Sequence, residues 1–300
     1  MGRFGGIELG GTKTVVVLGA DDTIVERRRF STTTSSETME RAIQTLAEWH
    51  DAQPLDGIGI ASFGPVQVDP ADPNHGFVLT TSKPGWSGAD VTGPVRSRFD
   101  CPVGLDTDVN AAALAEYHRG AARGCSSMVY LTIGTGVGGG LVIDGRPVHG
   151  RLHPEIGHVR LRRGAFAQFD GACPFHGDCI EGLVSGPALA ARFGCDPAEV
   201  APDDPRWDPV CADLAELFAM LVLTLSPSRI VVGGGVVLGQ PHLLTRCAAI
   251  LPRILGGYLP DYDEEAVRAL LVPPENGDDA GPRGALLLAG LAATGQDMRR

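Results

Sequence analysis

Short apolar segments flank glycine-rich turns at two places in the chain. The first is the segment 6–18, in which apolar residues lie on both sides of a turn at 10–13. This order is typical of a strand, a tight turn and a second strand. The segment 128–143 repeats it around a glycine-rich turn at 134–140. Two copies of one hairpin indicate a duplicated, two-lobed architecture.

The segment between the two hairpins predicts a helix, a strand and a long loop. Thr34 and Glu37 have capping-box spacing ahead of apolar residues with a helical period, so we expect a helix to begin after Thr34. The apolar run 57–61 predicts a short buried strand. The segment 69–93 is rich in Pro, Gly, Thr and Ser. It should form a loop, and its length makes it a candidate binding loop.

The remaining pattern predicts helices at 111–122, 218–225 and 285–293. Residues 218–225 are apolar on every side, which predicts a fully buried helix. A strand at 230–232 follows it. Helices and strands that alternate in this way indicate an α/β fold.

Composition and charge narrow the class of protein. The chain has 300 residues, of which 43% are hydrophobic and 20% charged, so it can bury a large core in two lobes. No apolar stretch approaches the roughly 18 residues of a membrane-spanning helix, and the first residues lack the apolar segment of a signal peptide. We therefore expect a cytoplasmic protein without a membrane partner. A net charge of -11 also argues against a nucleic-acid partner, and seven unevenly spaced cysteines fit a reducing compartment.

The turn at 10–13 suits phosphate binding. Glycine lets the backbone turn tightly and bring its N–H groups close to a phosphate, and Thr12 and Lys13 could add donors. The turn is not a Walker A loop, because Thr12 intervenes before Lys13 and no helix clearly follows. The alternative is a plain tight hairpin turn.

Two further glycine clusters follow apolar strands. Gly134, Gly136 and Gly139 match the dinucleotide fingerprint formally, but that fingerprint requires a helix after the loop, and an apolar strand follows here. We therefore exclude a Rossmann site. The cluster Gly233 to Gly235 follows a strand where an open sheet would present a ligand crevice, and its alternative reading is a turn that enters a helix. Together, the three clusters resemble the nucleotide site of the actin, hexokinase and Hsp70 superfamily.

Asp108 is the candidate general base. It stands where a strand passes into a helix, so its side chain could project from the helix start. The alternative role is a helix N-cap. Beside phosphate loops, the same carboxylate could accept the proton of an attacking hydroxyl group during phosphoryl transfer. Asp106 is the second candidate for this role.

A cluster of metal-ligating residues follows the second hairpin. Cys173, His176 and Cys179 lie at two-residue gaps with glycine on both sides, which is a specific signal for zinc. His158 is the first candidate for the fourth ligand and His153 the next. Four protein ligands leave no open position, so we expect a structural metal.

In combination, these motifs resemble the ROK family, named for repressors, open reading frames and kinases, over nearly the whole chain. The motifs that carry the resemblance are the opening phosphate motif at 8–13, the base segment at 107–110, the second phosphate motif at 133–140, the Glu-x-Gly-His signature at 155–158, and the knuckle with its following glutamate and Ser-Gly pair at 173–186.

The family resemblance implies a two-lobed, actin-like or hexokinase-like ATPase fold of duplicated ribonuclease H-like domains. We expect an N-terminal lobe of residues 1–114, completed by a C-terminal helix at 284–300, and a C-terminal lobe of residues 115–283. ATP and Mg²⁺ would bind between these lobes. The resemblance also implies a homodimer.

The resemblance further implies roles for individual residues. Asp108 would be the base, and His158 would bridge the zinc site to the sugar pocket. The expected substrate contacts are Asn110, Glu155, His158 and Glu181, and the expected nucleotide contacts are Glu8, Gly10, Gly11, Thr12, Lys13, Gly134, Thr135, Gly136, Gly233, Gly234 and Gly235. For Glu155 and Glu181 the alternative is a solvated surface carboxylate.

Two departures from the commonest family pattern point to one branch. Glu8 stands where Asp is usual, and His176 stands where a middle cysteine is more common. Both variants, together with the segments 61–65 and 83–86, look like those of bacterial fructokinases. This resemblance implies ATP-dependent phosphorylation of D-fructose to fructose 6-phosphate. The alternatives are a glucokinase, a mannokinase or a broad hexose kinase.

Non-catalytic readings are weaker. ROK regulators carry an N-terminal helix-turn-helix of dozens of residues, whereas here the first phosphate loop begins by residue 10, so we expect no DNA-binding domain. A sugar sensor or a zinc-dependent scaffold would not need both a candidate base and phosphate loops.

Overall fold

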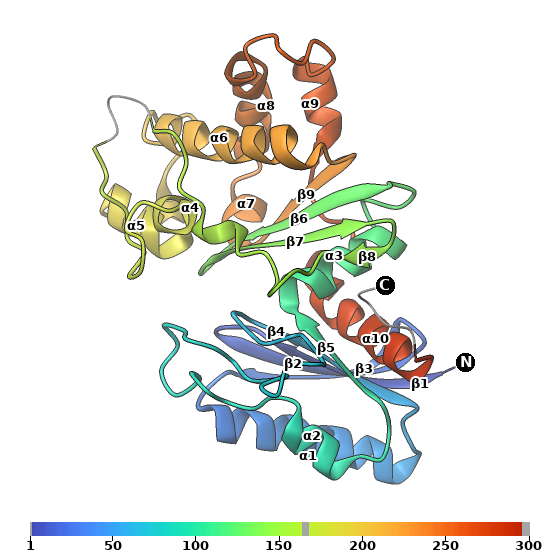
Figure 1. Cartoon of the computed structure of the whole chain (residues 1–300). Helices are drawn as coiled ribbons and strands as arrows, with labels where there is room; N and C mark the ends of the chain where they lie inside the picture. The colour runs from blue at the N-terminus through green and yellow to red at the C-terminus, as the bar shows by residue number, and fades with distance from the viewer. Residues whose placement is uncertain (1, 164–167, 296–300) are drawn as a thin grey trace. The chain divides into compact units, whose positions relative to one another are not determined.

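The computed structural model describes residues 2–163 and 168–295 of the chain (Figure 1). The chain divides into two compact units. The first holds the residues up to Gly120, then Gly140–Pro154 and the residues from Asn276 onward, and the second holds Ala121–Gly139 and Glu155–Glu275. The architecture is mixed α/β with two sheets, as the sequence predicts.

The first sheet has the strand order β3-β2-β1-β4-β5. Its strands are β1 (Arg3–Leu9), β2 (Lys13–Ala20), β3 (Thr23–Ser31), β4 (Gly57–Ser62) and β5 (Val103–Thr107). β1 pairs antiparallel with β2 and parallel with β4. Side chains of β1 and β4, such as Ile7, Leu9 and Ile60, are fully buried and form the centre of the core. The predicted hairpin at 6–18 and the predicted strand at 57–61 are therefore confirmed.

Helices cover both faces of the first sheet (Figure 1). They are α1 (Ser35–Ala52), α2 (Gly93–Arg98), α3 (Asp108–Arg119) and α10 (Ala280–Ala293). α1 begins where the capping box predicts, because the Thr34 side chain accepts a hydrogen bond from the Glu37 N–H. α10 packs so closely on the opposite face that a Cβ atom at Gly59 would lie 1.9 Å from the Ala285 carbonyl oxygen.

The second sheet has the strand order β10-β9-β6-β7-β8. Its strands are β6 (Ser127–Ile133), β7 (Val137–Ile143), β8 (Arg146–Pro147), β9 (Arg229–Gly233) and β10 (Leu271–Val272). The helices of the second unit are α4 (Ile180–Val184), α5 (Gly186–Phe193), α6 (Trp207–Leu225), α7 (Gly235–Gly239), α8 (His242–Ile254) and α9 (Glu264–Leu270). β6 pairs parallel with β9, and β9 pairs parallel with β10. Short 3₁₀ turns occupy Ile156–His158, Pro197–Glu199 and Gly277–Asp279.

The second hairpin differs from its prediction in the length of its turn. β7 begins at Val137, so three of the glycines assigned to the turn at 134–140 lie in a strand. These glycines allow close approach by neighbouring segments. A Cβ atom at Gly139 would lie 2.7 Å from a methyl carbon of Ile156, and one at Gly140 would lie 2.4 Å from the Val109 carbonyl oxygen.

Several helix boundaries also differ from the prediction. α3 begins at Asp108 instead of residue 111, because Thr107 caps it. α6 begins at Trp207, and the expectation that 218–225 is fully buried is wrong for Leu223, whose exposed fraction is 55%. The helix expected at 284–300 is α10, and residues 296–300 lie outside the described part of the chain. Within the described residues, no helix has the length and apolar character needed to cross a membrane.

Candidate active site and metal centre

The first phosphate loop is the turn between β1 and β2. The Gly10 N–H donates to the Lys13 carbonyl oxygen at 3.0 Å, and the Thr32 hydroxyl donates to the Gly10 carbonyl oxygen at 2.8 Å. Gly11 and Thr12 are exposed at the tip of this turn. Hydrogen bonds therefore fix the base of the turn, and its exposed tip is accessible to a ligand.

The predicted binding loop at 69–93 contacts this turn. The Lys83 ammonium group donates a hydrogen bond to the Gly11 carbonyl oxygen. Partial burial lowers the pKa of Lys83. Next to it, Trp86 is fully buried and its indole N–H donates to the Thr33 carbonyl oxygen at 2.8 Å. Trp86 thus anchors the loop that brings a cation to the first phosphate loop.

Asp108 is the first residue of α3 and does not cap it. The N-cap is Thr107, whose hydroxyl oxygen accepts from the Asn110 N–H at 3.1 Å, so the N-cap reading of Asp108 is wrong. One carboxylate oxygen of Asp108 accepts from the Val109 N–H at 2.9 Å. Burial raises the pKa of Asp108 to about 6, although the Val109 hydrogen bond opposes the shift. A carboxylate that titrates near neutral pH suits general-base catalysis.

Glu8 lies in β1 just before the first phosphate loop. Its Oε2 atom is buried and has no hydrogen-bond partner within the described parts of the chain. A Cβ atom at Gly281, in the first turn of α10, would lie 2.1 Å from the Glu8 Oε1 atom. Burial and, to a smaller extent, the nearby Asp108 carboxylate raise the pKa of Glu8 to about 7, while Lys13 opposes this shift. An orphaned buried carboxylate of this kind is suited to a hydrated cation.

Asp106 is fully buried at the end of β5 and is surrounded by hydrogen-bond donors. Its Oδ1 atom accepts from the Thr107 N–H at 2.7 Å and from the Asn110 side-chain amide at 2.8 Å. The His149 Nε2 atom lies 3.1 Å from the same oxygen and 3.0 Å from Oδ2. Neighbouring groups therefore hold the Asp106 carboxylate in place at the end of β5.

His149 is a partner of Asp106 that the sequence does not predict. It lies 43 positions after Asp106, and a lone histidine carries no local pattern that marks it as a partner. Asn110 is predicted to contact substrate. Its side-chain amide donates a hydrogen bond to Asp106, while its buried Oδ1 atom lacks a partner among the residues described.

The second phosphate loop consists of residues 134–136 in the second unit. The Gly134 N–H donates to the Gly136 carbonyl oxygen at 2.9 Å, and Thr135 is exposed at the tip. The Val137 N–H donates to the Glu181 Oε2 atom at 3.0 Å. Glu181 is therefore not a solvated surface carboxylate, and that alternative is wrong.

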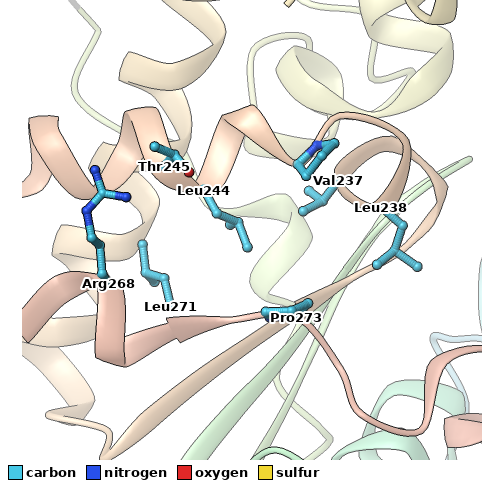
Figure 2. Close-up of a pocket in the computed structure, with 8 residues that line it drawn as sticks. Val237, Leu238, Leu244, Thr245, Arg268, Leu271 and Pro273 are labelled. Carbon is cyan, nitrogen blue, oxygen red and sulfur yellow. The ribbon is translucent and has the colours of Figure 1, made fainter. Parts of the chain in front are cut away.

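The third glycine cluster enters a helix. Gly234 has a φ of 88° and a Cβ atom there would lie 2.4 Å from backbone atoms of Ile133, so glycine is required on both counts. Gly235 starts α7, which agrees with the helix-entry reading. Beside α7 lies a cavity of about 290 Å³ (Figure 2). It is lined by Val237, Leu238, Pro241, Leu244, Thr245, Arg268, Leu271 and Pro273.

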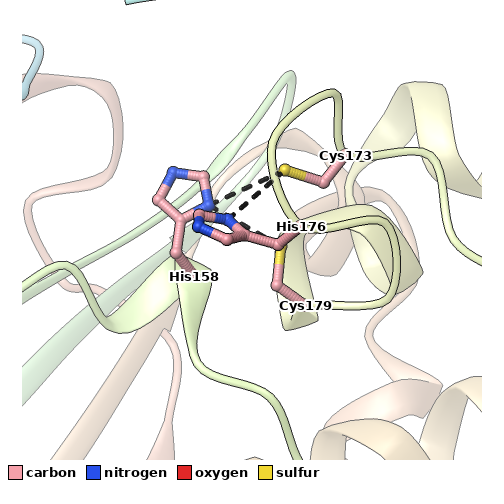
Figure 3. A group of neighbouring side chains, drawn as sticks. All are labelled: His158, Cys173, His176 and Cys179. Atoms are coloured by element: carbon pink, nitrogen blue, oxygen red, sulfur yellow. Dashed lines mark hydrogen bonds between the residues drawn. The ribbon is translucent and has the colours of Figure 1, made fainter. Parts of the chain in front are cut away.

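The structure gathers four metal-ligating side chains in the second unit (Figure 3). Ligand atoms of His158, Cys173, His176 and Cys179 all lie within 4.8 Å of one another. The His158 Nδ1 atom lies 3.6 Å from the Cys179 sulfur and 3.9 Å from the Cys173 sulfur, and the His176 Nδ1 atom lies 3.8 Å from the Cys173 sulfur.

These distances fit a tetrahedral metal site. With zinc–sulfur and zinc–nitrogen bonds of about 2.3 and 2.0 Å, a tetrahedron separates its sulfur and nitrogen ligands by about 3.6 Å. Burial raises the pKa of the Cys179 thiol to about 11, so a thiolate at this position calls for a cation. A donor set of two thiols and two imidazoles is typical of zinc.

His153, the second candidate for the fourth ligand, lies elsewhere. Its Nε2 atom accepts from the Val66 N–H at 3.2 Å, and its Nδ1 atom donates to the Pro154 carbonyl oxygen at 3.4 Å. Burial lowers the pKa of His153, in keeping with the neutral ring that these contacts need. Glu155, also predicted to contact substrate, precedes the 3₁₀ turn and its carbonyl oxygen accepts from the His158 N–H at 3.0 Å.

The chain is similar to known proteins over nearly its whole length. The chain matches the ROK family over residues 4–291. It is 40% identical over 294 residues to a fructokinase of Zymomonas mobilis, covering 95% of this chain and 96% of that protein. It is 38% identical over 289 residues to a fructokinase of Pediococcus pentosaceus, covering 95% and 97%.

Solved structures show the same fold. A ROK hexokinase from Thermus thermophilus superposes with a TM-score of 0.78 at 27% identity, covering 98% of this chain and 99% of that one. A ROK family glucokinase from Streptomyces griseus in complex with glucose and AMPPNP superposes with a TM-score of 0.74 at 26% identity, covering 96% and 99%. The predicted hexokinase-like fold is confirmed, and the chain belongs to the ROK family.

Proposed function

We propose that the chain is an ATP-dependent hexose kinase that converts D-fructose to fructose 6-phosphate. The single observation that carries this proposal is Asp108, a carboxylate with a pKa of about 6 at the start of α3, in the same unit as the first phosphate loop. Relatives that are 38% and 40% identical over nearly the whole chain are named fructokinases, which favours fructose.

Asp108 acts as the general base in this proposal. It accepts the proton of the sugar 6-hydroxyl group as the hydroxyl oxygen attacks the γ-phosphate of ATP. At neutral pH most Asp108 side chains are ionised and able to accept that proton, because their pKa is about 6. Asp106 cannot easily do so, since Thr107, Asn110 and His149 already contact its oxygens.

The nucleotide contacts come from the glycine clusters. Backbone N–H groups of the turns 10–13 and 134–136 bind phosphate oxygens, and the cluster 233–235 lies near the adenosine. The Streptomyces griseus relative binds an ATP analogue, which supports ATP as the donor. Glu8 would hold Mg²⁺ through water, and the ion would neutralise phosphate charge.

The sugar contacts follow the family pattern. Asn110, Glu155, His158 and Glu181 bind sugar hydroxyl groups in this proposal. The four ligands His158, Cys173, His176 and Cys179 would hold a structural zinc ion, which would fix the loop that carries them. We also propose a homodimer, which light scattering of the purified protein would test.

The test is a comparison of sugars. Release of ADP is measured with ATP and Mg²⁺ against fructose, glucose, mannose and N-acetylglucosamine at equal concentrations. A preference for fructose supports the fructokinase proposal. Equal use of several sugars would support a broad hexose kinase, the alternative that the hexokinase and glucokinase neighbours favour. No turnover with any sugar in metal-loaded protein would refute the kinase proposal.

A further inference from the structure

The second phosphate loop is fastened at two points to the segment that follows the metal ligands. The Gly186 N–H donates to the Gly134 carbonyl oxygen at 2.7 Å. The Val137 N–H, at the other end of the loop, donates to the Glu181 Oε2 atom at 3.0 Å. Glu181 is the second residue of α4, and Gly186 is the first residue of α5, so the short segment 181–186 contacts both ends of the loop.

Two metal ligands belong to the elements that make these contacts (Figure 3). Cys179 is the N-cap residue of α4, two positions before Glu181. His158 ends the 3₁₀ turn whose Gly157 lies against β7, because a Cβ atom at Gly157 would lie 1.8 Å from the Val137 carbonyl oxygen. Val137 is thus contacted on its N–H side through Glu181 and on its carbonyl side by the His158 turn.

A further hydrogen bond joins the two ligand-bearing elements. The Ile180 N–H donates to the Val159 carbonyl oxygen at 3.0 Å. Cys179 and His158, each next to one of these residues, approach to 3.6 Å between sulfur and Nδ1. A cation bound by both side chains would draw the same two elements together and hold the Glu181 carboxylate at the Val137 N–H.

We propose that Glu181 is a positioning residue that couples the metal centre to nucleotide binding by the second phosphate loop. This inference rests on the proposed function, because it requires the loop to bind phosphate. Its mechanism is a charge-assisted hydrogen bond that fixes the backbone of the loop before the nucleotide arrives. A role in sugar binding alone would leave nucleotide affinity unchanged when no sugar is present.

The first test is calorimetric titration of zinc-loaded protein with Mg·ADP in the absence of sugar. Glu181→Ala should weaken ADP binding by about tenfold, the loss expected for one charge-assisted hydrogen bond. Glu181→Gln keeps an oxygen acceptor for the Val137 N–H and should restore most of the affinity. Glu199→Ala is the matched control, because Glu199 is exposed in the same unit and should leave ADP binding unchanged.

The outcomes separate this inference from the proposed function. Equal ADP affinity in wild type and Glu181→Ala refutes the inference and leaves the kinase proposal intact. If Glu181→Gln binds ADP as weakly as the alanine variant, the acceptor at Val137 is not the cause, and the inference is also refuted. If wild type does not bind ADP, both proposals fail.

The second test uses reciprocity and measures the coupling in the wild type as well as in the variant. If the metal strengthens ADP binding, ADP must strengthen metal binding by the same factor. Zinc affinity is measured by competition with a chromogenic chelator, with and without Mg·ADP. We expect ADP to raise the zinc affinity of wild type and to leave that of Glu181→Ala unchanged. No effect of ADP on wild type would overturn the coupling.

Discussion

Replacement of Asp108 by asparagine should abolish turnover and stabilise the protein at the same time. Burial raises the pKa of this carboxyl group from 3.8 to about 6, so its ionised form is disfavoured in the folded state. A shift of this size corresponds to about 3 kcal/mol at pH values above the folded pKa. Asparagine has no charge to bury and keeps an oxygen that can accept from the Val109 N–H. The proposed base therefore costs stability that a neutral replacement recovers.

The sign of the pH dependence follows from the direction of the shift. Because the folded pKa lies above the unfolded value, the folded state binds the proton more tightly. The wild type is then most stable relative to the variant below about pH 4, and it loses this stability as the pH rises through about 6. The advantage of Asp108→Asn should be about a fifth of its maximum at pH 4, about half at pH 5, and largest at pH 8.

The assay is urea unfolding of both proteins at pH 5 and pH 8, combined with ADP release at pH 8. We expect Asp108→Asn to unfold at higher urea at pH 8, by a margin that shrinks at pH 5, and to lose at least about a hundredfold in kcat. The wild-type kcat/KM should fall about tenfold per pH unit below pH 6, because only the ionised base accepts the proton. A variant that is less stable at pH 8, or that retains turnover, would refute the assignment of Asp108 as a buried base.

Three further predictions concern the scaffold around the site. Gly59→Ala should destabilise the protein by about 1–3 kcal/mol, because its Cβ atom would lie 1.9 Å from the Ala285 carbonyl oxygen. Gly239→Ala is the control in the same denaturant melt, because a Cβ atom there has no atom of another segment within 4 Å in the described structure. Cys179→Ser should lower both the zinc content of the purified protein and its Tm. A zinc content and a Tm equal to those of the wild type would argue against a metal centre. Lys83→Met should raise the KM for ATP several-fold with little change in the KM for fructose, because it removes the cation that contacts the first phosphate loop; a change in only the fructose KM would contradict this role.

The cluster of metal-ligating side chains could be predicted from the sequence because its signal is local. Cys173, His176 and Cys179 lie within seven residues, and their spacing alone restricts where their side chains can go. The fourth ligand could not be chosen with the same ease. His153 and His158 are only five positions apart. What distinguishes them is that His153 accepts a hydrogen bond from the N–H of Val66, a residue distant in sequence. Long-range contacts of this kind leave no mark on a single sequence.

The glycine-rich segments show a second limit. The sequence predicts a turn at 134–140, and the structure confirms a turn only at 134–136. Glycine serves two purposes that a single sequence does not separate, tight turning and close approach. Gly139 and Gly140 serve the second, because neighbouring atoms occupy the space of a side chain.

The three carboxylates near the first phosphate loop show how environment, rather than residue type, divides the chemistry. Asp106 and Asp108 are alternating residues at one strand end, and the sequence ranks Asp108 first only because it stands at the expected start of a helix. The Thr107 N–H and the Asn110 amide both donate to the Oδ1 atom of Asp106, and the His149 Nε2 atom lies 3.0 Å from its Oδ2 atom, so neighbouring groups hold this carboxylate in place. Asp108 is contacted by the backbone N–H groups of Val109 and of Asp108 itself and is otherwise desolvated, which leaves it able to take up a proton near neutral pH.

Glu8, the third of these carboxylates, lies in a different environment again. Its Oε2 atom has no partner in the described residues, and its pKa of about 7 is raised by burial and by the Asp108 charge. A cation beside Glu8 would remove that cost, and it would also lower the pKa of the neighbouring Asp108. The profile of kcat, measured with Mg²⁺·ATP bound, should therefore have its acid limb at a lower pH than the profile of Asp108 titration in the free protein. Identical values would mean that the cation is not held close to these two carboxylates.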